Sequence, residues 1–359
     1  MKNIVIWLLL TFLVLLRILN YYISRPIYQN GQELRITTRV WEEPRVYQNS
    51  QLLIIEGLRV FLDKYPEIIY GDLIVIEGKV EDGSLKNPKL VDHKQSTSPL
   101  FLIRQRLLGF YQRSLPKNDS ALISGMVLGS RAGISQDFWK SLIKSGTAHV
   151  VVASGMNVAL VGGFVIAFLT NLVSRKKAVW LAVGMIWVYA VFSGFDAPII
   201  RAAIVGSLVF LSQGLGKRAY TLRLLFLTGF IMLLVKPSWI SDLGFILSFV
   251  ATASLVVFGI KVDKLLYFVP KSLKIIKDGL STSLSAQIGV APILFFYFGQ
   301  FNLASPLINA SVLWTVASIT IIGMIAGLVG LVFEPVGRLI LLLAYPLTRF
   351  FITIVQLFG

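Results

Sequence analysis

Long apolar segments recur along this chain, and they predict a series of membrane-spanning helices. The first runs from Ile4 to Leu19 and is interrupted only by Thr11 and Arg17. After residue 146, further apolar stretches approach the length of about 17–25 residues that crosses a bilayer. Backbone groups in lipid must bond within their own segment, so each stretch is expected to be a helix. The eight later stretches run roughly over 147–170, 178–195, 199–214, 219–235, 240–260, 280–299, 306–332 and 338–358, which makes nine predicted spans.

A different pattern fills residues 32–94. Leu34, Ile36, Thr38 and Val40 alternate with the residues between them, which is the period-2 signal of a strand with one buried face. Similar runs follow, and glycine and aspartate residues between them supply turns. We therefore expect a small all-β domain of about 60 residues, folded as an open five-stranded barrel.

The segment from 96 to 146 predicts amphipathic helices rich in basic residues. Its seven lysines and arginines face only two aspartates, so its net charge is +5. Such helices lie on a bilayer surface with snorkelling cations, or they form an electrostatic funnel for a polyanion, and the pattern leaves both interpretations open. The basic residues singled out here are Arg104, Arg106, Arg113, Lys140 and Lys144.

The loops between the predicted spans give an orientation. Eleven basic residues lie in alternate loops at 175–177, 217–223 and 261–277, whereas the intervening loops hold only Lys236. The positive-inside rule places the basic loops and the N-terminus in the cytoplasm. The β domain and the basic helices are then external to the cytoplasmic membrane.

Composition agrees with a membrane protein and excludes several classes of site. Of 359 residues, 55% are hydrophobic and only 14% are charged, against about 25% charged in soluble domains. The chain has no cysteine and two histidines, which excludes disulfides, cysteine-ligated metals and histidine-rich metal sites. It also lacks a phosphate-binding G-x-x-x-x-G-K-[ST] loop and a catalytic constellation. We therefore predict no enzyme, no cofactor and no resident metal.

Polar residues within the apolar stretches are the candidates for function. Arg201 lies in the external third of its span, and a charge at that depth normally pairs or faces water. Asp196 and Asp242 are predicted at the same depth, so we expect one of them to pair with Arg201. Such a pair either holds helices together or forms part of a permeation path. The other path candidates are His149, Ser154, Gly155, Asn157, Gln287 and Asn309.

The string from Ser145 to Asn157, SGTAHVVVASGMN, resembles the hallmark of the ComEC competence family. Asn157 stands where that family usually has a second histidine. The resemblance covers about 30–350, and its β segment is similar to the OB-like domain of the family. Further matching pieces, in order, are Gly194 with Arg201-Ala202, Gly244 to Ala251, Ser285 to Gln287 with Pro292, and Asn309.

The resemblance implies an inner-membrane channel that passes single-stranded DNA into the cytoplasm during natural transformation. A C-terminal metallo-β-lactamase-like domain, which many members carry, is absent from this chain, so either a separate nuclease is expected to degrade the other strand or this is a reduced, divergent member with another cargo. A DNA receptor and a cytoplasmic helicase are the other expected partners, beside membrane lipid. Two alternatives stay open: a secondary carrier for a small solute, and a membrane scaffold that transports nothing.

The expected fold class is an α-helical polytopic membrane protein of about nine spans, with an external OB-like β domain between its first and second spans. The expected divisions are an N-terminal transmembrane helix at 1–23, the OB-like domain at 24–95, the amphipathic basic helices at 96–146 and the multi-span channel domain at 147–359.

Overall fold

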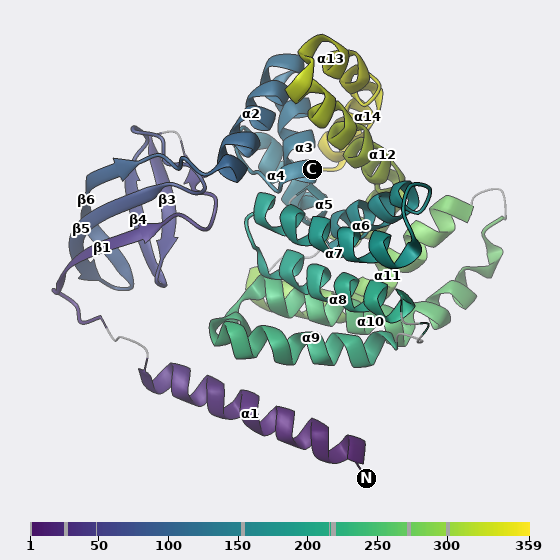
Figure 1. Cartoon of the computed structure of the whole chain (residues 1–359), viewed down its shortest axis with the longest axis horizontal. Coiled ribbons are helices and arrows are strands. Elements are labelled where there is room, and N and C mark those ends of the chain that lie inside the picture. The colour runs from purple at the N-terminus through teal and green to yellow at the C-terminus, as the bar shows by residue number, and fades with distance from the viewer. Residues whose placement is uncertain are drawn as a thin grey trace.

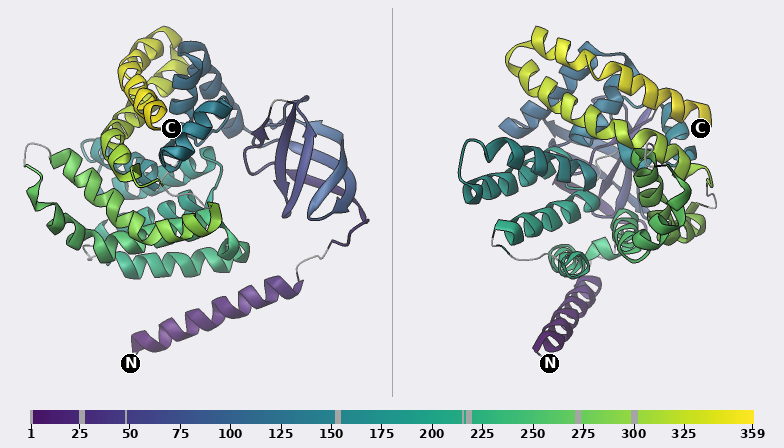
Figure 2. Two further views of the ribbon diagram at one scale, coloured as in Figure 1. Left: turned by 180° about the vertical axis from the view of Figure 1, so that it is seen from behind. Right: turned by 90° about the vertical axis from the view of Figure 1, so that its right-hand side faces the viewer.

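The computed structural model contains an N-terminal helix, a small β domain and a large helical body (Figure 1). The β domain lies to one side of the helical body. In both views of Figure 2, the N-terminal helix runs along the edge opposite to the last helices of the chain. The structure describes residues 2–24, 28–47, 49–151, 155–214, 216, 220–270, 274–298 and 302–359.

The β domain is one sheet with the strand order β1-β5-β6-β4-β3-β2. Strands β1 and β2 form its two edges and are separated only by residues 40–44. Taken as two halves of one broken strand, they close the sheet into a five-stranded barrel of the OB type, in which β4 and β6 are the parallel pair. The predicted barrel is therefore present, with its first strand interrupted. The strands are β1 Glu33–Arg39, β2 Arg45–Val46, β3 Ser50–Ile55, β4 Leu58–Asp63, β5 Leu73–Glu81 and β6 Ser84–Lys94.

Alternation along the strands builds the core of the barrel. In β4, Leu58, Val60 and Leu62 are buried, whereas Arg59 and Phe61 between them are exposed. This is the period-2 pattern that a strand with one face on a core requires. The domain therefore keeps its branched aliphatic side chains inside and leaves a mixed basic and aromatic row outside.

The helices of the body follow the apolar stretches of the sequence, but fewer of them qualify as spans than predicted. Among the residues that the structure describes, six helices are long and apolar enough to cross a bilayer, and the pair α13 and α14, bent by 49°, adds a seventh if it counts as one span. Helix α9 has only 15 residues, and α7 starts with three basic residues. The helices after residue 147 are α5 Ala148–Val151, α6 Gly155–Leu169, α7 Arg175–Phe192, α8 Ala197–Gly214, α9 Thr221–Val235, α10 Leu243–Leu265, α11 Lys274–Phe298, α12 Ser305–Val332, α13 Glu334–Leu342 and α14 Tyr345–Phe358.

Helix α1, Lys2–Ser24, is attached to the body through α9 and the turn that follows it. The rings of Trp7 and Phe230 lie 5.7 Å apart, and Arg17 donates to the carbonyl of Leu234. Most of its other large apolar side chains are exposed. An apolar helix with so little protein contact fits a membrane-spanning segment, because lipid can cover the remaining faces.

Three helices form the segment predicted to be amphipathic: α2 Pro99–Ser114, α3 Lys117–Leu128 and α4 Gln136–Lys144. Helix α3 differs from the expectation, because Asp119–Leu128 are all buried. It lies between α2, α12 and α14, and Leu122, Ile123 and Met126 join a single core with those helices. Helix α3 is therefore a central packing element of the body rather than a surface helix.

Helix α12 accepts these neighbours through a row of glycines. A methyl group added to Gly327 would lie 2.3 Å from Oη of Tyr111, and one added to Gly330 would lie 2.6 Å from the ring of Phe110. Gly323 meets Val127 in the same way, at 2.9 Å. Small residues at this spacing let helices approach closely, which is a common basis of packing within membranes.

This packing predicts that the Gly330→Ala substitution lowers the free energy of unfolding by about 1–3 kcal/mol, because the added methyl overpacks a buried contact. Thermal unfolding of the purified protein in detergent measures the effect. The matched control is Gly163→Ala in α6, where an added methyl meets nothing within 4 Å. Equal unfolding temperatures for the two variants would contradict the proposed helix contact.

Candidate functional site

Helices α3 and α8 pack against the described residues at the end of α5 and the start of α6. Helix α5 ends at Val151 and α6 begins at Gly155. Ser154, one of the predicted path residues, lies outside the described residues. A methyl group on Gly125 of α3 would lie 2.6 Å from the carbonyl oxygen of Val151, and one on Gly155 would lie 2.8 Å from Nη2 of Arg201 in α8.

The segment before α5 is held against the start of α12. Gly146 has a positive φ of 74°, and a methyl group there would lie 2.2 Å from the hydroxyl of Ser305. Asn302 donates to the carbonyl of Lys144 at 2.6 Å. His149, in the first turn of α5, retains accessible surface although protein atoms surround it. The tight turn at Gly146, three residues before His149, therefore packs against the N-terminal end of α12.

Arg201 carries a positive charge into the body without an acidic partner. Its Nη1 donates to Thr252 of α10, whose hydroxyl donates to the carbonyl of Ser248 at 2.9 Å. Its Nε is buried and has no hydrogen-bond partner. Within the described part of the chain, Arg201 forms no ion pair. The guanidinium of Arg201 therefore bonds to the hydroxyl of Thr252 through Nη1, and its Nη2 packs against Gly155.

The predicted ion pair of Arg201 with Asp196 or Asp242 is wrong. Asp242 is the N-cap of α10 and accepts from the amide of Phe245 at 2.7 Å, so its carboxylate serves the free end of that helix. Asp196 lies between α7 and α8 and faces Arg131, at 3.9 Å. Both carboxylates lie where two helices meet. The carboxylate of Asp242 accepts from a backbone amide, and that of Asp196 faces the guanidinium of Arg131.

Asn157 and Asn309 are buried with one polar atom of each unsatisfied. Asn157 donates to the carbonyl of Met126 at 2.7 Å, and its Oδ1 has no partner. Asn309 donates to the hydroxyls of Ser283 and Ser305, each at 3.3 Å, and its Oδ1 is likewise free of partners. Buried orphan acceptors are costly, and native structures usually explain them by a bound group or water.

The structure unites part of the predicted set. Gly155 of α6 packs against Arg201 of α8, and Asn157 follows two residues later in α6. The Gly146 turn packs against Ser305 of α12, which accepts a hydrogen bond from Asn309. Gln287 is half-buried in α11 and forms no hydrogen bond within the described residues. Its helix packs on α10 and α12, and no hydrogen bond within the described part of the chain joins Gln287 to the other candidates.

The predicted group of external basic residues divides in two. Arg104 does not belong to an exposed surface, because its side chain is only 6% exposed. It donates to the carbonyl of Phe192 at 2.8 Å and to Glu43, and it stacks over the ring of Tyr70. Four members are exposed: Arg106, Arg113, Lys140 and Lys144.

Glu43 joins the β domain to the helical body, and sequence patterns did not indicate it. It lies in the interruption between β1 and β2. Its carboxylate accepts from the hydroxyl of Ser130 at 2.6 Å and from the amide of Arg131 at 2.5 Å, beside the guanidinium of Arg104 at 3.3 Å. Tyr70 donates across the same junction to the carbonyl of Val191, and burial raises the pKa of Tyr70 to about 12. These contacts fix the barrel on the body.

A second buried carboxylate, Asp119, also escaped the sequence analysis. It accepts from the hydroxyl of Thr348 at 2.8 Å and lies 3.2 Å from the guanidinium of Arg349, both in α14. Nothing in the sequence around Thr348 and Arg349 predicts this contact, because only the packing of α14 on α3 brings these two residues to Asp119. This contact ties the last helix to the centre of the body.

Asp196, between α7 and α8, is expected to make the stability of the folded protein depend on pH. Burial raises the pKa of Asp196 from 3.8 to about 6, and the cation of Arg131 only partly opposes that rise. The folded protein then binds the proton more tightly than the unfolded chain. The contribution of this group to stability is full below pH of about 4 and is lost as pH rises through about 6.

We therefore expect the wild-type protein to lose stability relative to Asp196→Asn between pH 4.5 and pH 8, since the amide stays neutral throughout. Thermal unfolding in detergent across this range measures the difference. Asp137→Asn, at an exposed position of α4, provides the background for a surface aspartate. A constant difference between wild type and Asp196→Asn would show that Asp196 does not titrate in this range.

Comparison with known proteins supports an assignment to a family. The pattern of the family described as Competence protein matches residues 126–359. ComE operon protein 3 of Bacillus subtilis (strain 168) is 26% identical over 211 residues, which cover 58% of this chain and 26% of that protein. The chain thus matches about a quarter of the length of this curated relative. No solved structure matches it. With more than half of its length matched, the chain belongs to the competence protein family.

Proposed function

We propose that this protein conducts single-stranded DNA across the cytoplasmic membrane, from the side of the β domain to the cytoplasm. The observation that carries the proposal is Arg201, a cation inside an apolar helical body with no carboxylate partner among the described residues. An intramembrane charge is costly unless it is compensated. A passing phosphate would supply the missing negative charge.

The groups that contact Arg201 are neutral, which favours passage of an anion over its retention. Thr252 occupies one Nη atom of Arg201, and the backbone of Gly155 packs against the other. Conduction requires binding that is strong enough to admit a charged solute and weak enough to release it. A single cation among neutral polar groups meets this requirement better than a dense basic cluster, which would retain a polyanion.

The orientation follows from loop charge. The connections from α6 to α7 and from α10 to α11 lie at the end of the body away from the β domain (Figure 1). Arg175, Lys176 and Lys177 begin α7, and Lys261 and Lys264 lie near the end of α10. The positive-inside rule then places these ends in the cytoplasm and the β domain outside it.

The β domain offers a surface that fits a single strand. On the outer face of β3 and β4, Phe61 lies opposite Leu52, which lies opposite Arg45 of β2, and Ile54 lies opposite Arg59. Phe61 is 49% exposed. This face is the one that OB barrels use for oligonucleotides, and an aromatic ring between cations combines base stacking with phosphate attraction.

The junction at Glu43 makes this surface a fixed entrance. Because Glu43, Tyr70 and Arg104 bond across it, the barrel is held beside the ends of α2 and α7. A strand bound on the barrel would therefore be delivered to a constant position on the body. The chain shows no nucleotide-binding loop in its sequence, so a cytoplasmic helicase is the proposed source of energy, with a DNA receptor and a nuclease as separate partners.

For the pathway, Arg201→Gln should reduce uptake of labelled DNA about tenfold or more in a transformable host that depends on this protein, because it removes a charge-assisted contact worth about 1.5–3 kcal/mol. Arg201→Lys should retain most of the uptake. Arg338→Gln, at an exposed arginine of α13 paired with Glu334, is the matched control and should transport normally. Full uptake by an Arg201→Gln protein present at wild-type levels would refute the proposed path.

For the entrance, Phe61→Ala should weaken binding of a fluorescent thymidine oligonucleotide to the purified full-length protein by about 1–3 kcal/mol, the value of one base-stacking contact. Fluorescence anisotropy measures the affinity, and the affinity should fall as salt rises. Val91→Ala, another exposed apolar position but on β6, is the control. Equal affinity of the wild-type and Phe61→Ala proteins would remove the β3–β4 face from the proposal.

A further inference from the structure

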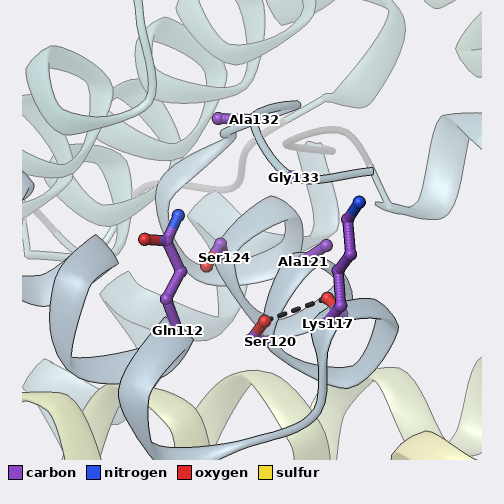
Figure 3. Close-up of a pocket in the computed structure, with 7 residues that line it drawn as sticks. All are labelled: Gln112, Lys117, Ser120, Ala121, Ser124, Ala132 and Gly133. Carbon is purple, nitrogen blue, oxygen red and sulfur yellow. Dashed lines mark hydrogen bonds between the residues drawn. The ribbon is translucent and has the colours of Figure 1, made fainter. Parts of the chain in front are cut away.

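A pocket with several polar side chains in its lining opens between α2 and α3, and none of the proposed path residues lines it. Its volume is about 280 Å³. Gln112 of α2 and Lys117, Ser120 and Ser124 of α3 line it, and the turn at Ala132-Gly133 borders it (Figure 3). Lys117, Ser120 and Ser124 follow the i, i+3, i+7 spacing of one helix face, so α3 presents all three to the same space.

Ser124 shows that the pocket lacks a polar partner. Its side chain is only 2% exposed, and its hydroxyl forms no hydrogen bond. Serine hydroxyls in helices commonly bond to the carbonyl one turn earlier, as Ser114, Ser285 and Ser311 do here. A buried hydroxyl that forgoes this bond and lines a cavity is positioned to donate to a bound group.

The charges around the pocket favour an anion. Lys117 is the one charged residue that lines it, and Lys117 forms no ion pair within the described chain. Asp119 does not offset this charge, because its carboxylate faces Thr348 and Arg349 on another side of α3. Lys117 also starts α3, whose first backbone amides carry the positive end of the helix dipole.

The remaining groups define the geometry of the bound anion. The hydroxyl of Ser120 donates to the carbonyl of Lys117 at 2.9 Å, which fixes one wall. Ser124 and the amide of Gln112 provide neutral donors opposite the ammonium of Lys117 (Figure 3). A tetrahedral oxyanion can accept bonds from several directions at once, as this arrangement requires.

We propose that this pocket binds a single phosphoryl group, with Lys117 as its counter-charge and Ser124 and Gln112 as its hydrogen-bond donors. Its volume lies just below the range of about 300–1,000 Å³ typical of pockets for drug-sized ligands, so it suits a phosphoryl group with a short substituent. The phosphoryl group belongs to a membrane phospholipid or to a soluble phosphate compound. Both sources share the chemistry that the pocket recognises.

The test uses the full-length protein in a neutral detergent and two probes. Native mass spectrometry measures binding of phosphatidic acid, with diacylglycerol, which lacks the phosphoryl group, as its matched control lipid. Isothermal titration measures binding of inorganic phosphate. We expect phosphatidic acid to bind and diacylglycerol not to bind. Much weaker binding of inorganic phosphate identifies a lipid as the source, and comparable binding identifies a soluble phosphate compound.

Two substitutions connect the binding to the pocket. Lys117→Gln and Ser124→Ala should each weaken phosphoryl binding about tenfold, the effect of losing one good hydrogen bond to a charged group. Lys140→Gln and Ser311→Ala, at exposed positions outside the pocket, should bind as the wild type does. Ser124→Ala should unfold no earlier than the wild type, because it removes an unsatisfied buried hydroxyl. Unchanged binding in both pocket variants, or equal binding of diacylglycerol, would overturn the proposal.

Discussion

The absence of water in a bilayer is the constraint on which this structure depends. Every backbone amide and every charge within the hydrocarbon must find its partner in the protein, so the apolar stretches fold as helices. The same constraint makes close helix contacts and uncompensated charges within the body informative. Gly125 lets α3 pack closely against Val151 of α5, and Gly155 lets α6 pack closely against Arg201 of α8. Arg201 is the exception among charges, because no carboxylate compensates it within the described residues.

A second exception connects the two parts of the molecule. An OB-type barrel needs a long first strand, yet here that strand is broken over residues 40–44. The break costs ladder hydrogen bonds, and it places Glu43 against Ser130, Arg131 and Arg104 instead. Charge-assisted hydrogen bonds are stronger than neutral ones, so this exchange favours a firmly placed barrel over a perfectly closed one. The proposed route of a strand from barrel to body relies on that placement.

Long-range packing explains where predictions from the sequence were inaccurate. Helix α3 lies in the segment predicted to form amphipathic basic helices, but it is buried because α2, α12 and α14 cover it and Arg349 meets Asp119. Nine spans were predicted from apolar length, whereas six or seven helices meet the stricter test of length and charge. The predicted pairing of Arg201 with a carboxylate rested only on their shared depth in the membrane. Depth does not determine which way a side chain points, and the carboxylate of Asp242 caps the N-terminus of its own helix.

The sequence by itself determined the class of the protein, its alternating β domain and the positions of most helices. These features depend on local periodicity and composition, which are present in the sequence itself. Only the tertiary structure decided that Glu43 holds the barrel, that Arg104 is buried, that Arg201 stays unpaired and that Lys117 and Ser124 line a pocket with Gln112. Each of these depends on contacts between elements that are distant in sequence or belong to different helices, and a side chain's partner there is set by how helices pack rather than by its neighbours in the chain.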